Sequence, residues 1–141
     1  MSKAFTISLL CMIAIMSYAQ EQRIFQCNLY NNEHKVYFVL NLYEKNITIP
    51  GQEIFGEVDG YLGSKQCTQV WAVTSSTIQK NNVAEITLIN NYGSEDLIAT
   101  LTLNSDGTYT YQHKEGSTLK FPVNGKWQKI PKKILLLKKD Q

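Results

Sequence analysis

Residues 83–107 read VAEITLINNYGSEDLIATLTLNSDG, and this stretch decides the fold. Apolar side chains occupy alternate positions in both halves, at Ala84, Ile86 and Leu88 and then at Leu97, Ala99, Leu101 and Leu103. Alternation with a period of two is typical of strands that bury one face. The segments Gly93-Ser94-Glu95-Asp96 and Asn104-Ser105-Asp106-Gly107 follow the two halves as turns, so the stretch predicts a β-hairpin.

The same pattern continues on both sides of this hairpin. Alternating segments separated by polar or glycine-containing turns cover residues 35–43, 69–79, 109–113 and 119–123, and we expect two last strands at 126–130 and 134–137, with Pro131 at their junction. Strands joined by short turns pair with their neighbours in sequence. We therefore predict an all-β fold, an antiparallel meander of about nine or ten strands forming a closed or partly closed calycin-like β-barrel. A two-sheet β-sandwich is the alternative.

The least regular segment runs from Gly51 to Gly63. It contains four glycines, at positions 51, 56, 60 and 63, among apolar residues. Glycines inside strands mark bends, bulges or the close approach of another chain. We expect a barrel corner here, with a ligand site as the alternative.

Residues 1–19 have the features of a secretory signal peptide. Lys3 precedes an apolar run from Ala4 to Met16, and Ser17-Tyr18-Ala19 places small residues before a cleavage site. The run is too short to span a bilayer. We expect cleavage near Ala19/Gln20, one β-barrel domain over residues 20–141, and a secreted or periplasmic location without a transmembrane segment.

Loss of residues 1–19 leaves two cysteines, Cys27 and Cys67, in a chain of 122 residues. An even pair in an exported domain predicts a disulfide, which would stabilise the fold by about 3–4 kcal/mol through closure of a loop of about 40 residues. Two buried thiols or a metal pair are the alternatives, and the spacing is poor for zinc. We predict a Cys27–Cys67 disulfide, no metal site and no cofactor.

The charge is unevenly distributed along the chain. Residues 20–125 hold 7 basic and 11 acidic groups, whereas residues 126–141 hold 6 lysines and a single acid, Asp140. The sum after cleavage is +1, which gives no case for a nucleic-acid partner. The C-terminal segment predicts a basic binding patch, made of Lys126, Trp127, Lys129, Lys132 and Lys133. The other interpretation, which we favour because Ile134 to Leu137 is a continuous apolar run, is that the lysines protect the last strand from edge-to-edge pairing.

Signatures of catalysis are weak. The carboxylates Glu53, Glu57 and Asp59 would share one face of an uninterrupted strand, with about 7 Å between the last two Cα atoms, a spacing near that of some glycosidases. Ser117 and Lys120 match a Ser-x-x-Lys pattern, but in a strand the two side chains point to opposite sides. His34 and His113 have no partner in a recognised arrangement. We predict no catalytic residue.

Two resemblances concern the architecture. The exported meander resembles the calycin barrels, and Phe25-Gln26-Cys27 is similar to a segment near the mature start of the periplasmic inhibitors of c-type lysozyme. The lipocalin Gly-x-Trp signature is missing near the first strand, since Gly125-Lys126-Trp127 lies at the other end of the chain. The Ser-x-Gly loop of the inhibitors is also missing, so neither resemblance implies family membership.

Three functions follow from these features. The first is an exported, non-catalytic binding protein that acts on another protein, like an inhibitor or an immunity factor. The second is a barrel that binds a small, apolar molecule in an interior cavity of roughly 300 Å³ or more. The third is a glycan-acting enzyme that uses Glu57 and Asp59.

Overall fold

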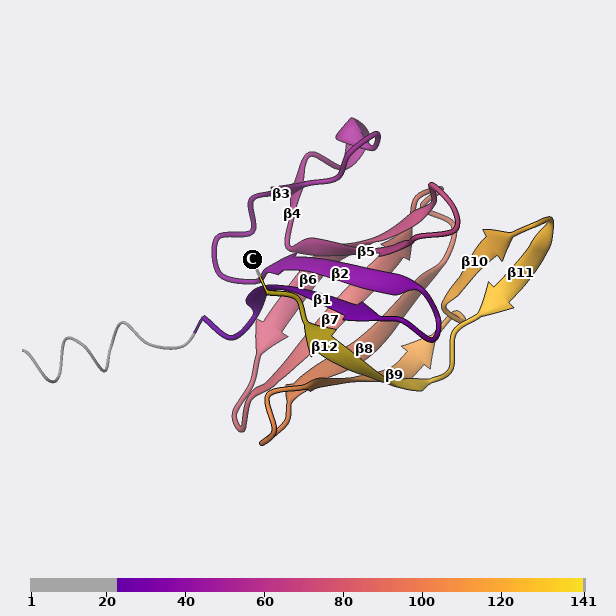
Figure 1. Ribbon diagram of the computed structural model, residues 1–141. Helices are drawn as coiled ribbons and strands as arrows, with labels where there is room; N and C mark the ends of the chain where they lie inside the picture. The colour runs from indigo at the N-terminus through magenta and orange to yellow at the C-terminus, as the bar shows by residue number, and fades with distance from the viewer. Residues whose placement is uncertain (1–22, 141) are drawn as a thin grey trace, which may run out of the picture.

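The computed structural model describes residues 23–140, which form a closed, antiparallel β-barrel of eight strands (Figure 1). The predicted signal peptide, residues 1–19, lies outside the described residues. Around the barrel the strands follow the order β1 (Gln26–Asn31), β12 (Lys133–Lys138), β9 (Tyr109–Gly116), β8 (Asp96–Leu103), β7 (Val83–Asn90), β6 (Val70–Ile78), β5 (Gly60–Ser64) and β2 (Val36–Asn41). The predicted barrel is confirmed, and the sandwich alternative is wrong.

The alternation in residues 83–107 produces the central hairpin of the barrel. Strands β7 and β8 pair in register, with Ala84 opposite Leu101 and Ile86 opposite Ala99, and all four side chains are fully buried. The preceding turn from β6 is a three-residue loop, Lys80-Asn81-Asn82, in which both asparagines have positive φ.

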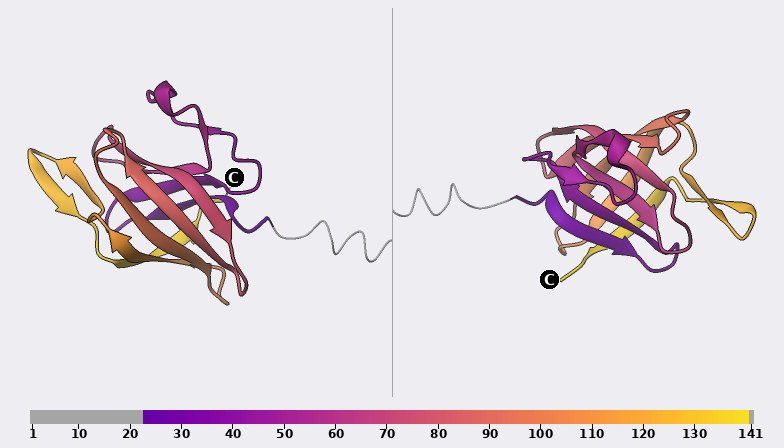
Figure 2. Two further views of the ribbon diagram at one scale, coloured as in Figure 1. Left: turned by 180° about the vertical axis from the view of Figure 1, so that it is seen from behind. Right: turned by 90° about the horizontal axis from the view of Figure 1, so that it is seen from above.

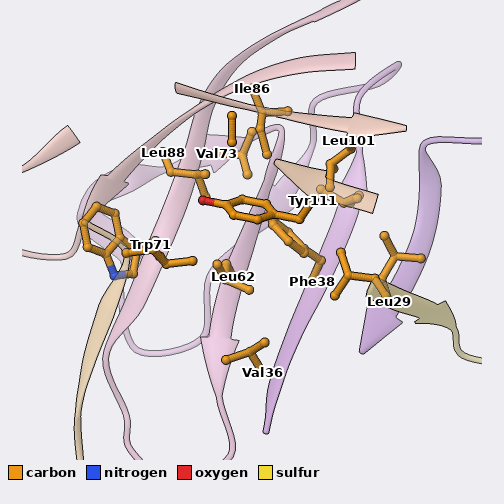
Figure 3. Close-up of a cluster of buried hydrophobic side chains, with 14 of the residues drawn as sticks. Leu29, Val36, Phe38, Leu62, Trp71, Val73, Ile86, Leu88, Leu101 and Tyr111 are labelled. Carbon is orange, nitrogen blue, oxygen red and sulfur yellow. The ribbon is translucent and has the colours of Figure 1, made fainter. Parts of the chain in front are cut away.

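Side chains fill the barrel interior (Figure 3). Tyr111 lies at its centre with its ring 6.2 Å from that of Phe38, and aliphatic residues from the surrounding strands pack around both rings. Other members of this cluster are Leu29, Val36, Leu62, Trp71, Val73, Ile86, Leu88 and Leu101. The interior is therefore a packed core, as expected for a barrel of this size.

Two excursions leave the barrel (Figure 2). The first contains β3 (Ile47–Thr48), the 3₁₀ turn η1 (Glu53–Phe55) and β4 (Glu57–Val58). It covers the outer face of β6, where Ile49, Val58, Val70 and Ala72 form a second buried cluster. The second is a hairpin of β10 (Lys120–Val123) and β11 (Lys126–Lys129), described below.

The segment from Gly51 to Gly63 is divided between the first excursion and β5. Gly51 and Gly56 have positive φ in the loop around η1, where an added Cβ would meet nothing. Gly60 begins β5 at the point where the chain rejoins the barrel, and its backbone lies against Val39. The predicted corner thus coincides with the return of the excursion to the barrel.

The barrel closes at the contact between its first and last strands. The ladder between β1 and β12 has two paired positions, Leu29 with Lys138 and Tyr30 with Leu137. The side-chain amide of Asn31 adds a bond to the carbonyl of Leu135 at 2.8 Å. We call this short ladder the seam.

The prediction of a disulfide is wrong, since both cysteines are free thiols in the structure. Cys27 pairs with Leu40 on β2, whereas Ser64, three residues before Cys67, pairs with Val36 at the other end of β2. Four residues of strand separate these points by about 13 Å, beyond the roughly 7 Å between Cα atoms that a disulfide allows. The two cysteines lie at opposite ends of the barrel.

We expect protein without residues 1–19 to carry two reduced cysteines. Alkylation after unfolding without reductant should add two groups per molecule, as measured by intact mass. In the folded protein Cys27 should react slowly, because burial raises the pKa of its thiol. Dithiothreitol should leave the melting temperature unchanged, and a peptide joining Cys27 to Cys67 would contradict the structure.

Among residues 23–140, no helix is long and apolar enough to cross a bilayer.

Candidate functional site

The hairpin of β10 and β11 projects from one end of the barrel (Figures 1 and 2). Its turn is Asn124-Gly125, with φ of 52° and 76°, which suits a tight two-residue connection. In this register Lys120 lies opposite Lys129, and Pro122 lies opposite Trp127. Side chains alternate across a strand, so these four residues share one face of the hairpin.

The other face anchors the hairpin in the core. Phe121 is fully buried there, and the flanking residues Leu119 and Ile130 are buried as well. The indole of Trp71 donates a hydrogen bond to the carbonyl of Lys120 at 3.1 Å. The amide of Gln128 donates to the carbonyl of His34 at 3.4 Å. The hairpin is therefore held against the barrel end by its base and inner face.

The outer face exposes an aromatic ring beside positive charge. Trp127 is 56% exposed, and the ammonium of Lys120 lies 4.8 Å from the centroid of its ring. The same ammonium lies 3.5 Å from a carboxylate oxygen of Glu95, at the turn before β8. Cation–π attraction and this ion pair together restrain both side chains.

The residues of the predicted basic patch are all exposed, but they do not share one face. Trp127 and Lys129 lie on the outer face of the hairpin, whereas Lys126 belongs to the opposite face by alternation. Lys132 and Lys133 lie where the chain rejoins the barrel, and the carbonyl of Lys132 accepts a hydrogen bond from the backbone of His113. None of these four lysines forms an ion pair in the described chain.

Comparisons of the chain with protein-family models, with curated proteins and with solved structures find no match.

The candidate carboxylates do not lie on one uninterrupted strand. Glu53 lies in η1 and Glu57 in β4, and Asp59 follows β4, so no uninterrupted strand carries all three. Asp59 is buried, accepts a hydrogen bond of 2.5 Å from the hydroxyl of Ser76, and lies 3.7 Å from the ammonium of Lys45. These contacts give Asp59 a structural role in fixing the base of the first excursion.

The Ser-x-x-Lys residues and the two histidines are the remaining candidates. Ser117 donates its backbone N–H to the carbonyl of Asp96, and the Lys120 ammonium is directed to Glu95 and Trp127. His34 lies in the turn between β1 and β2, and His113 lies on β9. Among residues 23–140, no group of three or more His, Cys, Asp or Glu side chains is placed to hold a metal.

Proposed function

We propose that this chain is an exported, non-catalytic binding protein that recognises another protein through the outer face of the β10–β11 hairpin. The observation that carries the proposal is Trp127, an exposed tryptophan held by Lys120 on a hairpin whose inner face is anchored in the core. Tryptophan and positively charged residues are enriched among the residues that dominate binding energy. A restrained anchor also loses little conformational entropy on binding.

Charge indicates the kind of surface that this face would bind. Lys120 and Lys129 flank Trp127, while Lys126, Lys132 and Lys133 lie nearby in the chain and carry unpaired ammonium groups. The complementary surface is acidic, with an apolar depression to receive the indole. Positive charge would also accelerate association at low ionic strength.

The packed interior supports surface recognition over the transport of a small molecule. Tyr111 and the side chains around it fill the centre of the barrel, where a carrier would hold its ligand (Figure 3). The export of the chain is part of the proposal and is based on the features of residues 1–19.

The proposal is tested with the double variant Trp127→Ala, Lys129→Glu. Immobilised wild-type protein should capture a specific acidic protein from the envelope fraction or medium of the source cells. We expect the variant to bind that protein at least about 30-fold more weakly, since loss of one central tryptophan costs about 2 kcal/mol or more. The free energy of unfolding should change by less than about 1 kcal/mol, because both side chains are exposed.

The matched control is Ile54→Ala with Lys80→Glu. It also removes an exposed apolar side chain and reverses one exposed lysine, but at sites away from the hairpin. This variant should keep the affinity of the wild type. Equal losses in both variants, or a partner that binds the hairpin variant normally, would contradict the proposal.

A further inference from the structure

A groove of about 570 Å³ opens on the outside of the barrel over β1 and β2, separate from the hairpin. Its floor is formed by Tyr30, Tyr37 and Val39, and Lys65 lies in its wall. The last residues described, Lys138 to Asp140, also line it. A second hollow of about 440 Å³ lies against the same tail beside Gln26, Cys27 and Asn28. The two hollows share Asn28, Lys138, Lys139 and Asp140 in their linings, so they are neighbours along a stretch of about 20 Å from Asn32 to Gln26.

The aromatic floor is built by strand register. Tyr30 lies opposite Tyr37 on β2, and Tyr37 lies opposite Gly63 on β5. The ring of Tyr37 covers Gly63, where an added Cβ would lie 2.6 Å from the ring, and it packs edge-on against Tyr61 with centroids 6.2 Å apart. These contacts hold the aromatic rings on the outer face of the barrel.

The groove is also positively charged. Lys65, Lys138 and Lys139 form no ion pair or side-chain hydrogen bond in the described chain, and Asp140 is the acidic residue among those that line the groove. Three ammonium groups against one carboxylate leave an excess of positive charge. The side-chain amides of Asn28 and Asn32 likewise have no hydrogen-bond partner within the described chain.

We propose that this groove binds an extended acidic oligosaccharide. The ammonium groups would pair with its carboxylate or sulfate groups, and the asparagine amides would bind its hydroxyl groups. The tyrosine rings offer electron-rich faces to the C–H groups of the sugar rings. This site differs from the hairpin in residues, in location and in the chemical class of its ligand.

Two other occupants fit less well. A peptide that adds a strand needs an open sheet edge of several residues, but on the β12 side β1 is already paired at Leu29 and Tyr30, and the carbonyl of Asn28 accepts a bond from the backbone of Lys139. A second copy of the chain, placed groove to groove, would bring two surfaces with the same excess of lysines together, which like-charge repulsion disfavours.

The experiment is an NMR and calorimetric titration of the protein lacking residues 1–19. The probes are a heparin-derived hexasaccharide, which presents sulfates, an oligogalacturonate of equal length, which presents carboxylates alone, and hexaglutamate as an acidic peptide. We expect saturable shifts at the amides of residues 28–32 and 37–39 with at least one oligosaccharide. The oligosaccharide that binds more tightly identifies sulfate or carboxylate as the recognised group.

Variants with matched charge distinguish binding in the groove from non-specific electrostatic attraction to the protein. The variant Lys65→Gln, Lys138→Gln, Lys139→Gln should weaken binding at least about tenfold at low salt. The variant Lys126→Gln, Lys129→Gln, Lys132→Gln removes the same charge at the hairpin and should retain the wild-type affinity. Tyr30→Ala should weaken binding several-fold with the charge unchanged, and melting curves should show that all three variants are folded.

Four results would overturn the proposal. They are equal weakening by the two lysine variants, an unchanged affinity in Tyr30→Ala, tighter binding of hexaglutamate than of either oligosaccharide, and the absence of binding to both oligosaccharides. None of these results bears on the hairpin, whose test uses a protein partner and different residues.

Discussion

Replacing Tyr111 with alanine is expected to lower the free energy of unfolding by about 3–5 kcal/mol, the usual cost of removing a large aromatic side chain from a core. Tyr111 is fully buried at the centre of the barrel against Phe38, and the surrounding strands cannot collapse into the space. Urea denaturation followed by circular dichroism measures the change.

Tyr111→Phe should instead leave the protein as stable as the wild type or more stable. The Tyr111 hydroxyl is buried and has no hydrogen-bond partner within the described chain, so its removal relieves a desolvation penalty. The control is Tyr109→Phe, which loses a hydrogen bond of 2.5 Å from the Tyr109 hydroxyl to the carbonyl of Ile24. The free energy of unfolding of that variant should be about 1 kcal/mol lower than that of the wild type. Equal destabilisation by the two substitutions would contradict this view of the core.

The alkaline limb of the stability profile offers a second measurement on Tyr111→Phe. Burial raises the pKa of Tyr111, so above about pH 10 its phenol ionises in the unfolded chain before it does in the folded one. Stability is unaffected below that pH and falls above it, by about 1.4 kcal/mol at pH 11 for one such group. Between pH 8 and pH 11 the free energy of unfolding of the wild type should therefore fall by about 1.4 kcal/mol more than that of Tyr111→Phe.

Gly60→Ala is expected to destabilise the barrel by about 3 kcal/mol. An added Cβ would overlap the carbonyl oxygen of Val39 and would lie 3.2 Å from Cα of Leu40. Both are backbone atoms of β2, so relief requires β2 and β5 to separate. Thermal and urea unfolding both report the loss.

The matched substitution is Gly63→Ala on the same strand. Its Cβ would meet the ring of Tyr37 at 2.6 Å, but that side chain is half-buried on the outer face and can rotate away. We expect a loss below about 1.5 kcal/mol. If Gly63→Ala proved as costly as Gly60→Ala, close backbone approach would not be the reason for glycine at position 60.

Most strands of the barrel could be predicted from sequence, and two of them could not. The segments containing β2 and β6 to β12 were all expected, because β2 and β6 to β10 lie in segments with alternating apolar residues and β11 and β12 lie in short segments on either side of Pro131. Strand β1 has a single fully buried apolar residue, Leu29, and β5 contains two glycines, so neither shows a periodic signal. Both are strands because their neighbours in the barrel pair with them.

The candidate surfaces were predictable only in part, because they depend on strand register. Lys120 was not included in the basic patch, although it lies as far before the Asn124-Gly125 turn as Lys129 lies after it. This equal spacing about the turn could have predicted that Lys120 and Lys129 lie opposite each other. The groove had no signal in the linear sequence, since its residues come from the outward faces of β1 and β2, the loop after β5 and the C-terminal tail.

The disulfide prediction failed for a related reason. A count of cysteines carries no information on strand direction, and Cys27 and Cys67 are separated by the length of β2. The alignment of Glu53, Glu57 and Asp59 on one strand was not realised, because Glu53 lies in η1 and β4 ends at Val58, before Asp59.

The seam determines when the fold can be completed. Its bond from Asn31 to Leu135 joins residues 104 positions apart, so the barrel cannot close until β12 has emerged from the ribosome. Until then β1 and β9 both present open strand edges, and such edges can pair with other chains. Because closure comes so late in synthesis, a truncation that removes β12 would leave both edges permanently open.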